Sequence, residues 1–273
     1  MKIPAFRRFA LPSAAVAALL LTGSLPAAGQ TPTSPAQPAD QHRPTLQRRP
    51  GELLDGREER VHVQVQHPAG IHNHDAIALT SQIMAMNLVH RVWCSSNAWA
   101  RSVERSLLPW ALADVELGDN TLEIGPGYGA NLRVLVDKTR QLTAVEIDAA
   151  MAERLRGKYG ERARIIHGDG SDTGLPAEDF SSVVCFTMLH HVPTPALQDQ
   201  LLAEAFRVLR PGGVFAGSDS AASTLFRLLH FRDTCNPVHP QTFPEHLRAA
   251  GFDDVHVEAN GRRLRWRAVK AGS

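Results

Sequence analysis

Cysteine is scarce in this chain, which holds three cysteines among 273 residues. Cys94, Cys185 and Cys235 form an odd and widely spaced set, and Cys185 lies inside the apolar run Val183–Phe186. This spacing gives no disulfide framework and no cysteine metal centre. We therefore expect three reduced thiols, with Cys185 in a core strand.

An excess of charge of one sign is also missing. The formal net charge is +1, and from Met84 onward 21 Lys and Arg face 22 Asp and Glu, a balance of −1. A protein that binds polyanions presents a basic surface, which this overall charge does not supply. The composition therefore predicts no nucleic-acid partner, and its 43% hydrophobic share fits one large α/β domain with an appendage.

The N-terminal region lacks an uninterrupted apolar run. Residues 9–29 carry no charge but include Pro12, Gly23 and Pro26, so they are a poor match to the about 20 apolar residues that span a bilayer. The basic start, the apolar middle and the small residues at 27–29 have the layout of a secretory signal peptide. We interpret residues 1–29 as a signal-peptide-like or anchor segment.

Residues 30–83 are interpreted as a linker and an extension of unknown role, ahead of a domain at residues 84–273. Five prolines fall within 30–50, where there is too little apolar surface to offset the entropy lost on ordering. His72, His74 and Asp75 bunch together, but no further ligand follows at a recognisable spacing. We therefore expect a polar surface loop there and no bound metal.

A helical pattern begins at Met86. Trp99, Val103, Leu107 and Trp110 follow one another at steps of four, four and three residues, which places them on one helix face. We expect this face to pack on a sheet, in preference to forming a substrate cap.

A glycine-rich turn follows the first predicted strand, Thr121–Ile124, and precedes a helical pattern that starts at Leu132. Glycines at 125, 127 and 129 let the backbone turn sharply and let a ligand approach where a Cβ would collide. The turn also fits the dinucleotide fingerprint, so it predicts a nucleotide cofactor without choosing between cofactors.

Acidic side chains mark the ends of the next two predicted strands. Leu142–Val145 ends at Glu146, which follows Gly125 at the distance where a carboxylate meets a ribose diol. Arg164–His167 ends at Asp169, on the strand edge where open α/β sheets bind ligands.

Two further strands complete a predicted parallel sheet. Ser182–Thr187 is apolar without alternation, as expected when both of its faces are covered. Helix 196–209 and the turn Arg210–Gly213 then lead to the strand Val214–Gly217. Strands that alternate with helices predict a doubly wound α/β fold.

Five motifs in this order resemble the class I S-adenosylmethionine-dependent methyltransferases, in particular the type 11 methyltransferase domain. The motifs are Leu122–Gly129, Val145–Asp148, Gly168–Gly170, Phe186–His191 and Leu209–Gly213. The resemblance implies S-adenosylmethionine as cofactor and a Rossmann-like seven-stranded sheet of order 3-2-1-4-5-7-6 with the last strand antiparallel. Val255–Glu258 and Arg263–Val269 are available for its closing hairpin.

The resemblance also implies a cofactor site, with no catalytic residue assigned. Glu123 and the glycines would contact the methionyl end, Glu146 the ribose, and Thr187 the surroundings of the sulfonium. Asp169 and Gly170 would contact the adenine. The full set of implied cofactor-binding residues is Glu123, Gly125, Pro126, Gly127, Gly129, Glu146, Ile147, Asp169, Gly170 and Thr187.

The methyl acceptor is expected to be a small molecule. The first three motifs also look like those of the ribosomal RNA adenine dimethylases, but that family's Asn-Leu-Pro-Tyr-type motif is replaced here by Thr187–His191. His190, His191 and His239 are candidates for removing a proton from the acceptor, although we expect one of the adjacent pair to pack and the other to be solvated. Residues 221–243 are expected to form a lid over the acceptor.

Two rival interpretations remain open at the level of sequence. The glycine turn and Glu146 would serve an NAD(P)-dependent oxidoreductase equally, and a non-catalytic module could keep the fold and bind S-adenosylmethionine without turnover. The resemblance places the catalytic domain in the cytoplasm, which conflicts with a signal-like N-terminus. An uncleaved anchor, or a true start at Met84 or Met86, would reconcile the two.

Overall fold

The computed structural model describes residues 88–272, apart from 222–225, 227–229, 231–232 and 262. The segments predicted at 1–29 and 30–83 lie outside the described residues, so the signal-like and linker interpretations stay predictions. Within the described part of the chain, no helix combines the length and the apolar character needed to cross a membrane.

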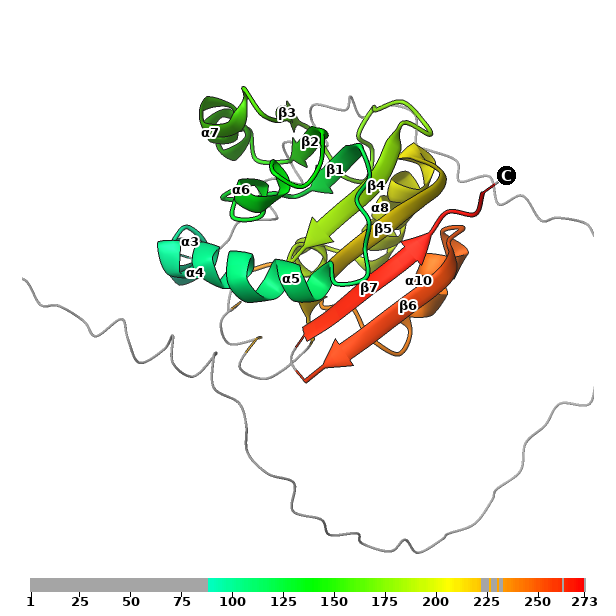
Figure 1. The fold of residues 1–273 in the computed structure, drawn as a ribbon. Coiled ribbons are helices and arrows are strands. Elements are labelled where there is room, and N and C mark those ends of the chain that lie inside the picture. The colour runs from blue at the N-terminus through cyan, green and yellow to red at the C-terminus, as the bar shows by residue number, and fades with distance from the viewer. Residues whose placement is uncertain (1–87, 222–225, 227–229, 231–232, 262, 273) are drawn as a thin grey trace, which may run out of the picture. The chain divides into compact units, whose positions relative to one another are not determined.

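The described residues contain a seven-stranded sheet of order β3-β2-β1-β4-β5-β7-β6 (Figure 1). The first five strands pair in parallel, and β7 pairs antiparallel with both β5 and β6. This topology confirms the predicted fold. The strands are β1 (Asn120–Ile124), β2 (Gln141–Glu146), β3 (Arg164–His167), β4 (Phe180–Phe186), β5 (Leu209–Ser220), β6 (Asp253–Asn260) and β7 (Arg263–Val269).

Both faces of the central strand β4 are buried, as its unbroken apolar run predicts. Val183 and Cys185 belong to one hydrophobic cluster, whereas Val184 and Phe186 belong to the other. The first cluster includes residues of α8 (Pro195–Val208) and α10 (Phe243–Ala249), and the second includes residues of α6 (Leu132–Leu135) and α7 (Ala149–Tyr159). Figure 1 shows α8 and α10 on the opposite side of the sheet from α5.

The first described helices are α3 (Leu88–Cys94), α4 (Asn97–Ser102), the π-helix η1 (Val103–Leu107) and α5 (Leu108–Ala111), and the last three are continuous. This continuous segment packs on the second cluster. Val103 and Leu107 are buried, with Trp99 and Trp110 packed partly buried beside them, which confirms the predicted packing face. The helix is interrupted before α4, where the Ser96 hydroxyl accepts a hydrogen bond from the Trp99 amide at 3.1 Å.

The fifth strand starts earlier than its apolar residues indicate. Leu209 already pairs with Phe180, and a register irregularity follows between Phe180 and Ser182. The predicted turn lies within β5 and pairs with the residue that follows β7. The Gly212 amide donates to the Lys270 carbonyl at 2.8 Å, and the Lys270 amide donates to the Gly213 carbonyl at 2.9 Å. A glycine turn and a strand are therefore compatible here.

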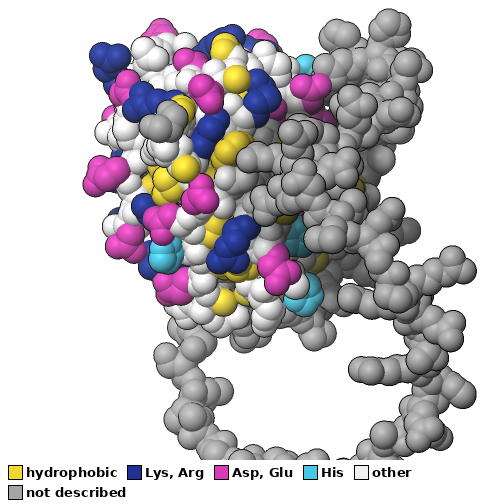
Figure 2. Space-filling view, turned by 90° about the vertical axis from the view of Figure 1, so that its right-hand side faces the viewer, with side chains coloured by type: hydrophobic (Ala, Val, Ile, Leu, Met, Phe, Trp, Pro, Cys, Tyr) yellow, Lys and Arg dark blue, Asp and Glu magenta, His cyan; other side chains and the backbone are white. Residues whose placement is uncertain are grey.

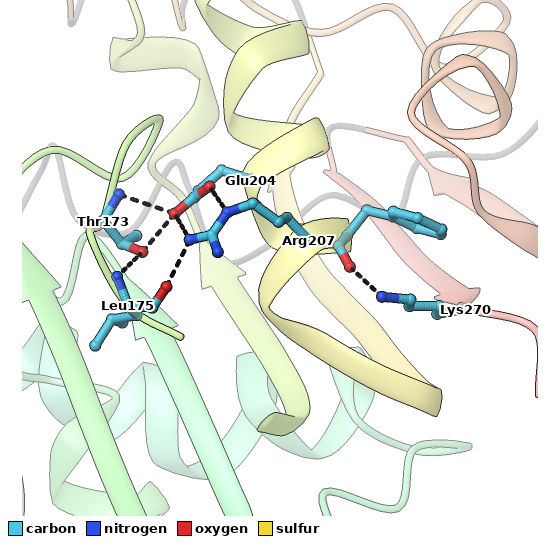
Figure 3. Close-up of polar contacts among 6 residues, drawn as sticks. Thr173, Leu175, Glu204, Arg207 and Lys270 are labelled. Atoms are coloured by element: carbon cyan, nitrogen blue, oxygen red, sulfur yellow. Dashed lines mark hydrogen bonds and ion pairs between the residues drawn. The ribbon is translucent and has the colours of Figure 1, made fainter. Parts of the chain in front are cut away.

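The loop after β3 is tied to α8 by charged side chains (Figure 3). Glu204 accepts hydrogen bonds from the Thr173 amide at 2.9 Å and from Arg207 Nε at 2.7 Å. Arg207 in turn donates to the Leu175 carbonyl at 2.7 Å. Beyond α8, Lys270 Nζ donates to the Phe206 carbonyl at 3.2 Å. These contacts fix the chain that leaves the carboxyl end of β3.

Charges of both signs are mixed on the described surface. Figure 2 shows basic and acidic side chains interspersed on the face that it draws, with no continuous region of one sign among the coloured residues. This pattern agrees with a formal net charge of +1.

Candidate functional site

The predicted site residues lie at the carboxyl ends of neighbouring parallel strands. Glu123 is in β1, just before the glycine turn, and Glu146 is the last residue of β2. Asp169 follows β3, and Thr187 directly follows β4. Because β3, β2, β1 and β4 are adjacent in that order, the topology brings these residues to one edge of the sheet.

The three glycines of the turn have positive φ angles but different surroundings. A Cβ on Gly125 (φ +70°) would lie 2.3 Å from Met188 Cγ, and one on Gly129 (φ +78°) would lie 2.7 Å from Leu155 Cδ2. A Cβ on Gly127 (φ +53°) would meet no atom within 4 Å. Two of the glycines are thus required by packing, whereas Gly127 borders open space that a ligand can fill.

Glu146 joins the tips of the first two strands. Its Oε2 accepts a hydrogen bond from the Gly127 amide at 2.9 Å, and its Oε1 accepts one from the Asp148 amide at 3.0 Å. Burial raises the pKa of this carboxyl, and the two amide hydrogen bonds oppose the shift. A carboxylate offers about four acceptor positions, so acceptor capacity for a diol remains.

Glu123 is fully buried, and only one of its two carboxylate oxygens has a hydrogen-bond partner. Asn131 Nδ2 donates to Glu123 Oε1 at 2.8 Å, while Glu123 Oε2 is buried without a hydrogen-bond partner. Burial raises the pKa of this carboxyl to about 8. A buried oxygen without a hydrogen-bond partner lowers the stability of the fold unless a ligand donates to it, and a cationic amine would be such a donor. Asn131 was missed at the level of sequence, where its only signal was a polar residue ahead of the helix after the turn.

The third strand end forms a tight acidic loop beside the first strand. Asp169 Oδ1 accepts hydrogen bonds from both the amide and the hydroxyl of Ser171, each at 2.8 Å. A Cβ on Gly170 would lie 2.4 Å from Ile124 Cγ2, so the loop backbone closely approaches β1. His167 Nε2 contacts the Ile147 carbonyl at 3.2 Å, which ties this loop to the end of β2.

Thr187 has an unusual backbone conformation for a residue that is not glycine. Its φ is +49°, and its amide donates to the Ser218 carbonyl of β5 at 2.7 Å. Left-handed backbone in a branched residue is strained and is held by its surroundings. Strain at the end of β4 directs the chain into the short 3₁₀ helix η2 (Leu189–His191).

The two adjacent histidines of η2 are both buried. His190 is 2% exposed and His191 is 9% exposed, so the expectation that one of them is solvated is wrong. His190 Nδ1 lies 2.5 Å from Asp219 Oδ1, and the His190 amide donates to Asp219 Oδ2 at 3.1 Å. His190 Nε2 is buried without a hydrogen-bond partner. His239 differs from both, because it is exposed to solvent.

Asp219 was not expected from the sequence. It lies at the end of β5, 29 positions from His190, and only the pairing of β4 with β5 brings the two together. The predicted lid at residues 221–243 falls partly outside the described residues and stays a prediction.

Comparison with known proteins identifies the domain that carries this site. Residues 122–217 match the family model described as a methyltransferase domain. A probable S-adenosylmethionine-dependent methyltransferase from Mycolicibacterium smegmatis is 33% identical over 163 residues, which cover 58% of this chain and 60% of the relative. A probable ribosomal RNA small subunit methyltransferase A from Pyrobaculum aerophilum is 32% identical over 121 residues, covering 41% of this chain and 53% of the relative.

A solved structure of a protein from Pyrococcus horikoshii shares the fold. It has a TM-score of 0.59 and 17% identity, and the match covers 68% of this chain and all of that one. The match with the curated relative from M. smegmatis thus spans about three fifths of that protein's length. Residues 122–217 are thus a methyltransferase domain, and the chain is similar over this region to S-adenosylmethionine-dependent methyltransferases.

Proposed function

We propose that this protein transfers the methyl group of S-adenosylmethionine to a small-molecule acceptor by in-line displacement. The observation that carries the proposal is the buried, unpartnered Oε2 of Glu123, in the strand that leads into the glycine turn. A carboxylate so placed suits the amine of the methionyl end, which adds the missing counter-charge.

The other strand ends supply the remaining cofactor contacts. Glu146 and Ile147 hold the ribose, because the Glu146 carboxylate keeps acceptor positions after binding two amides. Asp169 and Gly170 lie one strand further out and contact the adenine. Thr187 closes the set near the sulfonium, on the other side of β1.

Alignment of the reactants is the main task of the enzyme. The sulfonium leaves as a neutral thioether, so no acid is needed for its departure. His190 is suited to take a proton from an acceptor hydroxyl or amine, since Asp219 orients its Nδ1 and its Nε2 has no hydrogen-bond partner. Its contribution is greatest for acceptors that must lose a proton.

A small acceptor is favoured over ribosomal RNA. The near-zero net charge gives no field for a polyanion, and Thr187–His191 stands where the adenine dimethylases carry an Asn-Leu-Pro-Tyr-type motif. The relative from P. aerophilum bears a ribosomal RNA methyltransferase name, so RNA belongs in the acceptor assay as a competing substrate.

Calorimetric titration with S-adenosylmethionine and with NAD(P)H tests the cofactor assignment. We expect binding of S-adenosylmethionine alone, and a loss of at least about tenfold in affinity for Glu146→Ala. Glu153→Ala is the matched control, because it removes an exposed carboxylate that pairs with Arg156. Binding of NAD(P)H in place of S-adenosylmethionine would overturn the proposal.

Turnover is tested separately with methyl-labelled cofactor and a panel of small hydroxyl, amine and thiol compounds together with ribosomal RNA. Label transfer to a small compound supports the proposal, and transfer to RNA alone contradicts the acceptor class. Tight cofactor binding without transfer to any acceptor would identify a non-catalytic binding module.

A further inference from the structure

Three histidines from distant parts of the chain converge beside the predicted cofactor edge. His90 lies in α3, His191 in η2, and His230 follows β5. One ring nitrogen from each lies within 4.8 Å of those of the other two. Their sequence separation explains why no metal-ligand spacing was visible and why the sequence predicted no metal.

Each of the three rings is held by an acceptor outside the group. His90 Nδ1 lies 3.1 Å from Asp233 Oδ2, and His230 Nδ1 lies 2.8 Å from the Phe226 carbonyl. His191 has a hydrogen bond to the backbone of Thr234. Histidine ligands of metals are held in this manner, by a carboxylate or carbonyl on the nitrogen that does not bind the metal.

The rings are also in the state that a metal requires. Burial lowers the pKa of His90, His191 and His230, the last to about 4, so all three are neutral at pH 7. His230 is 6% exposed and its Nε2 is buried without a hydrogen-bond partner. A buried nitrogen lone pair of this kind is costly to leave unsatisfied.

Ring packing alone is the competing explanation of the group. The ring centroids of His90 and His230 are 4.5 Å apart in an edge-on arrangement, and those of His90 and His191 are 5.2 Å apart in a stacked one; both are ordinary distances for packed rings. Stacking does not explain why His230 Nε2 has no partner, nor why all three rings have outer acceptors. Metal coordination accounts for both observations.

We propose that His90, His191 and His230 bind a divalent transition metal ion of the zinc class, with one coordination position left open. Imidazole nitrogens suit Zn²⁺, Cu²⁺, Ni²⁺ and Fe²⁺, and three histidines with an open fourth position are typical of a site that binds a further ligand. Nitrogen-to-zinc distances of about 2.0–2.1 Å require only that the rings draw closer together.

Two of the three histidines are close in the chain to residues that contact or belong to the proposed cofactor site. His191 lies four positions after Thr187, and Arg91, next to His90, donates from Nε to the Tyr128 hydroxyl of the glycine turn at 3.4 Å. The open position is therefore placed to hold an oxygen or nitrogen of the acceptor. This role rests on the proposed function, whereas metal binding itself does not.

Calorimetric titration of the chelator-treated full chain with Zn²⁺ alone tests the site. We expect one ion per chain, and a loss of about 100-fold or more in affinity for His90→Gln and for His230→Gln. Asp233→Asn keeps all three ligands and should weaken binding by about 10- to 100-fold. Co²⁺ should give the absorption bands of a tetrahedral site in the wild type and not in the ligand variants.

Two matched controls separate this site from other histidines. His256→Gln removes an exposed histidine that pairs with Asp254, and the double variant His72→Gln, His74→Gln removes two of the five histidines that lie outside the described residues. Both should retain Zn²⁺ affinity. Circular dichroism and thermal melts identify any variant that fails to fold. If a ligand variant does not fold, the Zn²⁺ affinity of Asp233→Asn tests the site in its place.

Three results would overturn the inference. They are no saturable Zn²⁺ binding by the wild type, unchanged affinity in folded His90→Gln and His230→Gln, and loss of binding in the His72, His74 double variant alone. Titration of the same samples with S-adenosylmethionine keeps this outcome distinct from a failure of the proposed function, because the cofactor residues are not altered.

Discussion

At the scale of single residues, Glu123 combines full burial with an incomplete set of hydrogen bonds. Its carboxyl has a pKa of about 8 against an ordinary value of 4.5, chiefly because burial penalises the charged form. The cofactor-free protein therefore keeps Glu123 protonated at pH 7. Binding an ammonium group favours the ionised form, so cofactor binding should release a proton.

Replacing Glu123 by glutamine should remove this linkage. Wild-type affinity for S-adenosylmethionine should rise from pH 6 to pH 7.5, because the free energy needed to deprotonate Glu123 falls as the pH approaches its pKa of about 8. Glu123→Gln should bind about 10- to 100-fold more weakly, with a flatter pH profile. Titration calorimetry at several pH values measures both effects, and an unchanged profile in the variant would contradict this role for Glu123.

The same side chain makes a prediction for the stability of the cofactor-free protein. Since the folded pKa is raised, the favourable contribution is complete below pH 4.5 and is lost as pH rises to about 8. The slope is at most about 1.4 kcal/mol per pH unit. Urea unfolding at pH 5 to 8 should show Glu123→Gln gaining stability relative to the wild type as pH rises, whereas Glu153→Gln should run parallel to the wild type.

The predictable residues were those whose role depends on their place in a strand–turn sequence. Glu123, Glu146 and Asp169 end or adjoin apolar strands, so their position at the ligand-binding edge followed from the sequence pattern. Asn131 and Asp219 act through contacts with residues 8 and 29 positions away, respectively. Contacts of this kind depend on strand pairing and on helix orientation, which leave no local signal.

At the scale of secondary-structure elements, the glycine turn separates packing from binding. Gly129→Ala adds a methyl 2.7 Å from Leu155 Cδ2 at φ +78°, so it should destabilise the fold by about 2–4 kcal/mol. Gly127→Ala meets no atom within 4 Å and should cost only the backbone strain, about 1–2 kcal/mol.

Gly127→Ala should weaken cofactor binding more than Gly129→Ala does, the reverse of their effects on stability. The methyl of Gly127→Ala projects into the open space at the glycine turn, so we expect weaker binding of S-adenosylmethionine by a protein that remains folded. Urea unfolding and calorimetry on both variants measure the two quantities. Wild-type affinity in Gly127→Ala would show that the cofactor does not use this space.

The contact between α8 and the loop after β3 gives a prediction for stability (Figure 3). Burial raises the pKa of Glu204, but the hydrogen bonds from Arg207 and Thr173 outweigh it, so the net shift is downward from 4.5. Its stabilising contribution is therefore present above pH 4.5 and is lost as pH falls further. Glu204→Gln should lower the free energy of unfolding at pH 7 by about 1–3 kcal/mol.

Glu153 provides the matched control for Glu204, because it pairs with Arg156 at the same spacing of three residues. The Glu153 side chain is 76% exposed, whereas that of Glu204 is 7% exposed. Glu153→Gln should change the free energy of unfolding by no more than about 0.5 kcal/mol. Equal losses in the two variants, measured by urea unfolding, would contradict the importance of burial at Glu204.

Element types were more predictable than element boundaries. The apolar runs located the parallel strands, but β5 starts at Leu209 because Lys270 pairs with the glycines ahead of its apolar part. The π-helical turn at Val103–Leu107 was not predicted, since its apolar spacing fits an α-helix equally well. Hydrogen bonds to distant residues, and not local preference, decide such details.

At the scale of the whole molecule, the near-zero net charge should keep the affinity of the protein for RNA low. With a formal net charge of +1, binding to a ribosomal RNA fragment should be weak, with a Kd no tighter than about 10⁻⁶ M at physiological salt. Filter binding between 50 and 200 mM salt measures this affinity. Tight binding that persists at high salt would indicate a local RNA-binding surface and would reopen the acceptor class.

The overall topology could be predicted because the resemblance supplies the strand order. Alternating strands and helices alone predict a doubly wound sheet, but not that β7 inserts between β5 and β6. The meeting of His90, His191 and His230 could not be predicted, since it requires the placement of α3 and of the chain after β5. The histidine site is thus a property of the assembled fold.

The π-helical turn η1 determines how α4 and α3 are rotated about the helix axis relative to α5. In an α-helix each residue advances the chain by about 100°, so the broader π-helical turn is offset from an α-helical path by about one residue. Shortening Val103–Leu107 by one residue would rotate α4 and α3 relative to the docked α5. His90 would then move away from His191. The five residues of η1, none of which is a proposed metal ligand, therefore determine the direction in which the His90 ring points.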